Sequence, residues 1–491
     1  MTAHPLLYEV HARQWLAELG ARTLDAASED TLDELARRGV TYLWLMGVWS
    51  IGPRARAQAA THAGLRADYG AALPGWTDAD IRGSPYAIAD YQVAADLGGE
   101  AALAALRARL HRRGIGVLLD FVPNHTGLDH GWLAAHPARY VSAARAFPDS
   151  FPSGGRFVAH GKDPYFPGWT DTAQLEYRRG ETRAAMRDQL ASVAERCDGV
   201  RCDMAMLALS DVFARTWQHV PVEPDGDGAA SEGSFGEFWS DAIAHVRRTH
   251  GTFTFLAEAY WGLEGRLCEL GFDYAYDKQL YDLLVHDRPW DVQPHLLGLG
   301  PHTARRAHFL ENHDEPRAAA AVAPDLHRAA ALLTLGLPGM RFLHHGQLIG
   351  ARRFARIQLG RRAEEPRDAA IAALYDPLLA ALGASLVGRG DARLLAPRRA
   401  WDDNPTAACF TVVQWRSPGA DDRFDLVVVN LAPHRAQCRV VPEVPGLAEH
   451  AWQLTDRLGD ERWLRDGHEL AAAGLYLDLP ARGAQLFEVR R

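Results

Sequence analysis

The sequence predicts an α/β protein built on a (β/α)8 barrel, followed by a C-terminal antiparallel β domain. Two observations lead to this fold class. Up to about residue 385, short apolar runs alternate with segments whose apolar residues recur at helical spacing. Beyond Gly388, strand-like runs with turns between them replace that alternation.

The first elements follow from apolar runs with clear ends. The run Tyr42–Met46 is short and rich in aromatic residues, as in a buried strand. Glu100–Arg113 carries leucines at helical spacing and stops at a glycine. Gly116–Phe121 is almost continuously apolar, which is typical of a parallel strand covered on both faces. The same reasoning predicts a strand at Leu6–His11 and a helix at Thr31–Arg38.

The alternation pauses in the stretch 126–170, which is irregular and rich in Pro, Gly, His and aromatic residues. Loops of this length in compact domains are usually functional. Further strands and helices are then expected up to residue 344. The strands are Gly199–Cys202, Phe253–Leu256, Phe272–Tyr276, Ala307–Leu310 and Met340–His344. The helices are Arg183–Arg196, Ser234–His250 and Asp325–Leu335.

The C-terminal part reads as a separate β domain. A boundary is expected near Gly388–Gly390, where the helical spacing ends. Alternating runs at Cys409–Trp415, Phe424–Val429 and Gln485–Val489 are separated by turn sequences. They predict an antiparallel β-sandwich.

Composition excludes several classes of protein. The 491 residues carry a net charge of −9, which argues against nucleic acid and anionic membranes as partners. No segment approaches the ~18 consecutive apolar residues of a membrane span. Five cysteines without a CxxC pair predict neither a disulfide framework nor a zinc site. No secretory signal is visible at the N-terminus, so a cytoplasmic location is expected. The oligomeric state stays open.

Four short segments place acidic or His residues just after expected strands. They are Asp120–His125 (DFVPNH), Gly199–Asp203 (GVRCD), Phe255–Glu258 (FLAE) and Phe309–Asp314 (FLENHD). An unpaired carboxylate is costly to bury in a core. In a parallel barrel, however, strand ends converge on one open face that carries the chemistry. The four segments therefore predict a single active site.

These segments resemble, in order, the four signature regions of glycoside hydrolase family 13, the α-amylase family. Each segment alone is a weak signal, whereas all four in the family's order are a strong one. The resemblance implies a barrel (domain A) at 1–122 and 177–387, with a small inserted domain B at 123–176. It also implies a C-terminal β-sandwich (domain C) at 388–491, where the likeness is weaker.

Asp203 is the expected nucleophile of a retaining reaction, in which two carboxyl groups stand ~5–5.5 Å apart. Arg201 lies two residues earlier, on the same side of the strand, and could hold Asp203 ionised. Arg-x-Asp pairs are also ordinary ion pairs on many strands. Glu258 follows an aromatic, apolar strand that would raise its pKa, as a general acid needs. The competing interpretation is that Glu258 caps the next helix.

The resemblance also implies several residues that bind the substrate. Asp314 would bind sugar hydroxyls and favour the distorted ring, and the neighbouring His313 would donate to a hydroxyl. His125 would bind the same ring, while Asp120 would brace Arg201 or contact a hydroxyl. Tyr86, in the segment GSPYAIADY, would stack on the sugar. A structural role in the core is the alternative for the His residues and for Tyr86.

Further candidates for contact with the sugar have weaker support. Trp49, Trp169 and Trp261 could stack on sugar rings, although packing is an equally good explanation for each. Arg317, in the sequence HDEPR, could contact the substrate.

A calcium ion is doubtful, and no organic cofactor is expected. Asn124 matches a position that often ligates structural Ca²⁺ in the resembling family. Gln174, however, occupies the place of an expected carboxylate ligand. Ca²⁺ prefers six to eight oxygen ligands, including charged ones.

Hydrolysis of α-glucosidic bonds in oligosaccharides is the leading hypothesis, because it needs only water besides the site. The alternative is a glucosyltransferase, phosphorylase or isomerase that acts on a disaccharide such as sucrose, maltose or trehalose. A non-catalytic, amylase-like binding protein is a remote alternative. Such a protein would be expected to lack some of Asp203, Glu258 and Asp314, and all three are present.

Overall fold

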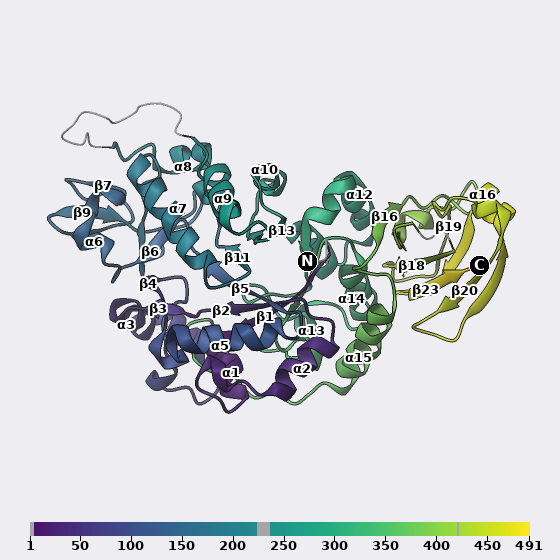
Figure 1. Cartoon of the computed structure of the whole chain (residues 1–491), viewed down its shortest axis with the longest axis horizontal. Helices are drawn as coiled ribbons and strands as arrows, with labels where there is room; N and C mark the ends of the chain where they lie inside the picture. The colour runs from purple at the N-terminus through teal and green to yellow at the C-terminus, as the bar shows by residue number, and fades with distance from the viewer. Residues whose placement is uncertain (1–3, 223–235, 420–421) are drawn as a thin grey trace.

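The computed structural model describes residues 4–222, 236–419 and 422–491. Within them, eight parallel strands close into a barrel, which confirms the predicted fold class (Figure 1). In spatial order the strands are β1 (Leu6–His11), β15 (Met340–His344), β14 (Arg306–His308), β13 (Tyr274–Tyr276), β12 (Thr254–Ala257), β11 (Gly199–Cys202), β5 (Gly116–Phe121) and β2 (Tyr42–Met46), which pairs with β1 again.

The eight predicted barrel strands are all present, with small shifts at their ends. The predicted helix Ser234–His250 corresponds to Phe238–Thr249, and residues 234–235 lie outside the described residues. The helices of the barrel region are α1 (Ala12–Glu18), α2 (Glu29–Arg37), α5 (Gly99–His111), α7 (Gly180–Ala194), α8 (Ser210–Trp217), α9 (Phe238–Thr249), α10 (Glu264–Glu269), α11 (Lys278–Val285), α12 (Pro289–Leu299), α13 (Ala318–Ala321), α14 (His327–Gly336) and α15 (Ala369–Ala384). None of the described helices is long and apolar enough to cross a membrane.

Side chains fill the barrel interior, as in other barrels of this size. Buried apolar and aromatic groups from several strands form one cluster there, including Trp44, Leu118, Leu256 and Phe342. Charged side chains of barrel strands are buried as well, and that of Arg201 is fully buried. Strand pairing places its backbone beside Asp120 on β5 and Leu256 on β12. The interior therefore contains a charge that its neighbours must compensate.

Two excursions leave the barrel. Between β5 and α7, strand β6 (His125–Gly127) pairs with β10 (Thr172–Gln174), enclosing α6 (Trp132–Ala135) and a three-stranded sheet. That sheet consists of β7 (Ser142–Ala143), β8 (Ser150–Ser153) and β9 (Arg156–Ala159). Between β2 and α5, a second excursion contains β3 (Trp49–Ile51), α3 (Pro53–Thr61), α4 (Ala63–Ala72) and β4 (Ile88–Val93). The sequence reasoning did not anticipate this second excursion.

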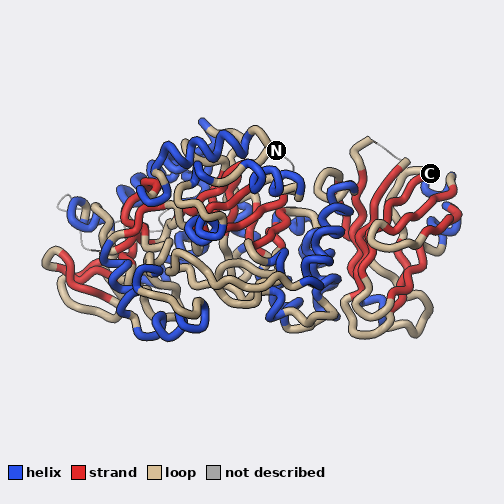
Figure 2. Tube along the Cα trace, turned by 90° about the horizontal axis from the view of Figure 1, so that it is seen from below, coloured by secondary structure: helices blue, strands red, loops and turns tan. Residues whose placement is uncertain are grey.

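The C-terminal strands form two antiparallel sheets to one side of the barrel (Figure 2). The larger sheet has the order β16 (Asp391–Leu395), β17 (Phe410–Arg416), β18 (Arg423–Asn430), β23 (Ala484–Arg490), β20 (Ala451–Asp456) and β21 (Arg462–Asp466). The smaller sheet pairs β19 (Ala436–Val440) with β22 (Leu475–Leu479), and α16 is Gly467–Ala472. The indole nitrogen of Trp415 donates to the Gly336 carbonyl at 2.9 Å, which ties β17 to α14.

Candidate active site

A cavity of about 670 Å³ opens at the carboxyl ends of the barrel strands. Asp203 directly follows β11, Glu258 directly follows β12, and Asp314 lies in the loop after β14. All three line this cavity. The segment 167–172 before β10 forms one wall, and residues of α3 and α4 form another. The four predicted segments therefore meet in one place.

Arg201 lies beneath this cavity and joins its carboxylates. Its Nη1 donates to Asp203 Oδ1 at 2.7 Å, and its Nη2 lies 2.7 Å from Glu258 Oε2. Asp120 is a third carboxylate, 3.8 Å from Nη1. The rings of Trp44, Tyr86 and Tyr276 lie around the guanidinium, with centroids 5.2, 5.2 and 5.8 Å from Cζ. One fully buried cation thus has anions on one side and aromatic faces around it.

The backbone after Asp203 orients Glu258. Met204 adopts φ +40°, a left-handed conformation that is unusual for a residue with a side chain. In this conformation its N–H donates to Glu258 Oε2 at 2.7 Å. The hydroxyl of Tyr260 donates to Oε1, also at 2.7 Å. Glu258 is therefore held through both carboxyl oxygens.

Burial and the neighbouring charges act on the pKa of both carboxyl groups. Burial raises the pKa of Glu258 to about 7; the Arg201 charge opposes the rise, and Asp203 and Asp314 reinforce it. Burial raises the pKa of Asp203 as well, but both the charge and the hydrogen bond of Arg201 oppose that rise. Because the two groups interact, they titrate as a pair. The Arg201 charge opposes protonation of both groups, and its hydrogen bond to Asp203 adds to that effect on Asp203.

His313 links the third carboxylate to the barrel. Its Nε2 lies 3.0 Å from Asp314 Oδ2 and 2.7 Å from the Tyr86 hydroxyl, and its Nδ1 lies 2.5 Å from Glu9 Oε1. Its ring also stacks on that of Tyr86, with centroids 5.6 Å apart. Burial raises the pKa of Asp314, but the adjacent imidazole outweighs this effect, so the pKa lies below its ordinary value.

Of the two remaining predicted residues, His125 lines the cavity and Asp120 lies beside Arg201. Burial lowers the pKa of His125 to about 4, so the ring is neutral at physiological pH. Its Nε2 has no hydrogen-bond partner among the described residues, and its ring lies 5.2 Å from that of Trp169 on the cavity wall. Burial raises the pKa of Asp120 to about 7, although Arg201 opposes this.

Comparisons with known proteins agree with this geometry. A family model of the α-amylase catalytic domain matches residues 30–164. The α-amylase MalA of Haloarcula japonica is 26% identical over 357 residues, which are 71% of this chain and 44% of MalA. The chain thus spans less than half the length of that curated relative. In the matched region the chain is similar to the catalytic domain of the α-amylase family.

Solved structures of this fold cover almost the whole chain. The noncanonic maltogenic α-amylase AmyB from Thermotoga neapolitana has a TM-score of 0.69 at 18% identity, covering 100% of this chain and 99% of AmyB. The α-amylase from Geobacillus thermoleovorans has a TM-score of 0.67 at 18% identity, with the same coverage. The trehalose-6-phosphate hydrolase of Bacillus licheniformis has a TM-score of 0.65 at 13% identity, again with that coverage. At these identities the likeness shows the fold alone.

Arg317, Trp49 and Trp261, which were predicted as candidate substrate contacts, do not line the cavity. Arg317 is buried and pairs with Glu311 and His344 at 2.6 Å each, which corrects the expectation that it contacts substrate. Trp49 is also buried, and its indole nitrogen donates to the Asp120 carbonyl at 2.8 Å. Trp261 is 42% exposed, does not line the cavity, and packs edge-on against Tyr165.

Some residues of the site were missed by the sequence reasoning. Glu9 and Tyr276 approach it from inside the barrel, and Gln58 and His62 line its wall from the second excursion. A charged residue within the apolar run of β1 was the available signal for Glu9. No motif marked the others, because they reach the site only through the tertiary fold.

The position expected for calcium does not fit the ion. The Gln174 side-chain nitrogen lies 2.8 Å from the Asn124 carbonyl, 3.0 Å from Asn124 Oδ1 and 3.1 Å from the Leu175 carbonyl. The side-chain N–H groups of Gln174 therefore already donate hydrogen bonds to the oxygens that would otherwise face a cation. In the described ranges, no group of three or more His, Cys, Asp or Glu residues is arranged to hold a metal.

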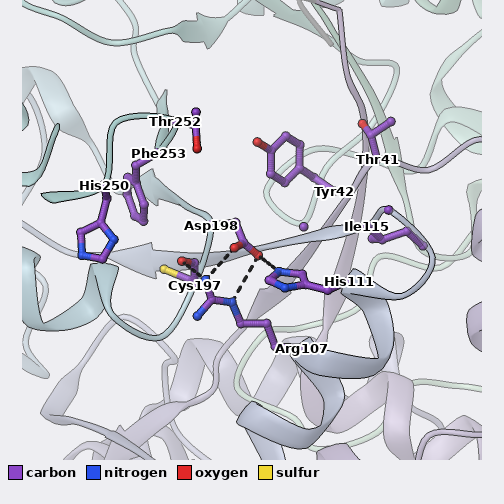
Figure 3. Close-up of a pocket in the computed structure, with 12 residues that line it drawn as sticks. Thr41, Tyr42, Arg107, His111, Ile115, Cys197, Asp198, His250, Thr252 and Phe253 are labelled. Atoms are coloured by element: carbon purple, nitrogen blue, oxygen red, sulfur yellow. Dashed lines mark hydrogen bonds and ion pairs between the residues drawn. The ribbon is translucent and has the colours of Figure 1, made fainter. Parts of the chain in front are cut away.

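A second cavity, of about 450 Å³, lies at the opposite end of the barrel, where the strands begin (Figure 3). Asp198 is at its centre. Its carboxylate accepts hydrogen bonds from Arg107 Nη2 at 2.6 Å and from the backbone N–H of Val117 at 2.7 Å. Its Oδ2 also lies 2.8 Å from His111 Nε2. These groups satisfy one another and join α5 to β5 and β11. We therefore assign this end to stability, as is usual for that face of a barrel.

We predict that EDTA lowers neither the melting temperature nor the activity appreciably, because the Gln174 amide already joins the segments that Ca²⁺ would bridge. A site that bound Ca²⁺ only in the native state would add about 2.7 kcal/mol at a hundredfold excess over its Kd. Thermal melts with EDTA, and then with Ca²⁺ or Mg²⁺ restored, measure this. A large fall in the melting temperature that Ca²⁺ alone reverses would contradict the prediction.

Proposed function

We propose that the protein is a retaining α-glycosidase that hydrolyses α-glucosidic bonds of oligosaccharides through a covalent glycosyl-enzyme intermediate. One observation carries this proposal. The neighbouring nitrogens Nη1 and Nη2 of one planar guanidinium contact Asp203 and Glu258 at 2.7 Å each. This brings the two carboxyl groups close together, as retention requires with its separation of ~5–5.5 Å.

In the first step, a carboxylate oxygen of Asp203 attacks the anomeric carbon, and the bond from that carbon to the glycosidic oxygen breaks. Glu258 gives its proton to the departing oxygen. In the second step, Glu258, now a carboxylate, takes a proton from water, and the resulting hydroxyl displaces Asp203. A pKa of about 7 suits Glu258 to both roles near neutral pH.

The remaining residues would bind the reacting ring. Tyr86 and Trp169 offer aromatic faces on the cavity wall, and His125 directs an unpartnered nitrogen from another side. Asp314 would accept hydrogen bonds from sugar hydroxyls. Its negative charge would also stabilise the oxocarbenium-like transition state. Asp120 would help to hold Arg201 in place.

The cavity favours an uncharged substrate. No Lys or Arg is among the described residues that line it, whereas Asp171, Asp203, Glu258 and Asp314 are. A phosphate monoester would therefore meet several carboxylates and no cation to pair with. We infer neutral α-glucosides of a few sugar units, not phosphorylated ones such as trehalose 6-phosphate.

We predict that incubation with maltooligosaccharides releases sugars with retained anomeric configuration, and that inorganic phosphate does not alter the products. Parallel reactions with sucrose, trehalose and trehalose 6-phosphate test the alternatives, with chromatography to identify the products. Sugar phosphates formed in the presence of phosphate would identify a phosphorylase, and isomeric disaccharides would identify an isomerase. Efficient cleavage of trehalose 6-phosphate would overturn the inference of a neutral substrate.

We predict that Glu258→Gln slows natural oligosaccharides by at least about 100-fold, within the range usual for a lost general acid. Aryl α-glucosides with acidic leaving groups should suffer much less in the glycosylation step, because their departing oxygen needs no proton. Pre-steady-state bursts on both kinds of substrate separate that step from deglycosylation. Equal losses on the two substrates would exclude Glu258 as the acid.

A further inference from the structure

Glu9 is a buried carboxylate for which the mechanism above has no role. Its side chain projects from β1 and is fully buried. Oε1 lies 2.5 Å from His313 Nδ1, while Oε2 has no hydrogen-bond partner among the described residues. A buried carboxylate is costly unless a positive charge compensates it. The contact with His313 is therefore the interaction that this residue depends on.

The hydrogen bonds around His313 define its protonation. An ionised carboxylate only accepts hydrogen bonds, so Nδ1 carries a proton that it donates to Glu9. Nε2 faces Asp314 Oδ2 at 3.0 Å and the Tyr86 hydroxyl at 2.7 Å. That hydroxyl donates to the Met46 sulfur at 3.2 Å, which leaves its oxygen free to accept from Nε2. With acceptor oxygens facing both ring nitrogens, this geometry is the one expected of an imidazolium.

The electrostatics of the site agree with this assignment. Burial lowers the pKa of His313, but the charges of Asp314 and Glu9 outweigh burial and raise the pKa well above its ordinary value. Other charged or titratable groups that act on His313 come from several strands and the loops after them: His11, Asp120, Asp203 and His344. Of all these groups, only Glu9 and Asp314 form ion pairs with the ring.

We propose that Glu9 is a positioning residue that keeps His313 as an imidazolium against Asp314 and Tyr86, and thereby extends activity to higher pH. This inference rests on the proposed glycosidase function. A charged His313 keeps Asp314 ionised and fixed, and it presents the Tyr86 ring to the substrate in one orientation. Without Glu9, His313 would lose its proton at a lower pH, and Asp314 would lose its cationic partner.

The test is Glu9→Gln, which keeps the size and one acceptor oxygen but removes the charge. The loss of a contacting opposite charge typically shifts a pKa by about 1–3 units. We expect the basic limb of kcat/KM to move to lower pH by about one unit or more. The substrate is an aryl α-glucoside with an acidic leaving group, whose glycosylation step does not need the proton of Glu258. The acidic limb should stay in place, because His313 is protonated there in both proteins.

Asp277→Asn provides a matched control. Asp277 is a buried carboxylate at the end of β13 that pairs with His295 and His308 at 2.9 and 3.0 Å, and it does not line the cavity. Its replacement should lower the melting temperature without moving the pH profile. If Glu9→Gln does not fold, Glu9→Asp carries the test, because its shorter carboxylate should move the basic limb in the same direction by a smaller amount.

An unchanged pH profile in a folded Glu9 variant would overturn the proposal, and so would an equal shift in Asp277→Asn. These outcomes differ from failure of the proposed function. In that case, the wild-type protein itself would cleave no α-glucoside. Separate kcat and KM values add a further check, because loss of Asp314 orientation should lower kcat more than it raises KM at high pH.

Discussion

The site depends on one interaction, the contact of the fully buried Arg201 guanidinium with two carboxylates. Removing a single partner of such a buried group typically costs about 3–5 kcal/mol, because it leaves an uncompensated charge. In this protein the cation lies 2.7 Å from a carboxylate oxygen of each acid and opposes the protonation of both. Asp203 receives a hydrogen bond that favours its ionised form, whereas burial and neighbouring negative charge raise the pKa of Glu258 to about 7.

The elements around this contact restrict its geometry. Aromatic rings from β2 and β13 pack around the guanidinium, which is fully buried. Met204 and Tyr260 fix both oxygens of Glu258, and the strained backbone at Met204 is maintained by this packing. On the other side of the site, Glu9 and Asp314 flank His313. The active-site charges thus form two linked groups, one centred on Arg201 and one on His313.

The sequence predicted the barrel well, because buried parallel strands such as Tyr42–Met46 and Gly116–Phe121 are short apolar runs whose ends are marked by glycine or charge. It also placed Asp203, Glu258, Asp314 and His125 at strand ends that meet. It could not predict Glu9 as a partner of His313, since these residues are 304 positions apart and only barrel closure brings them together. Arg317 was misassigned, because its sequence gave no indication that the chain turns it into the core beside Glu311.

The central claim is that Arg201 prepares Asp203 as the nucleophile, with Glu258 as the acid beside it. Trapping the intermediate tests it most directly. A fluorinated glucosyl fluoride that forms the glycosyl-enzyme quickly and releases it slowly would be added to the wild-type protein, followed by proteolysis and peptide mass spectrometry. Our account predicts one added glycosyl group, on Asp203. An adduct on Glu258 or Asp314 would contradict it, and so would active turnover with inverted products and no adduct.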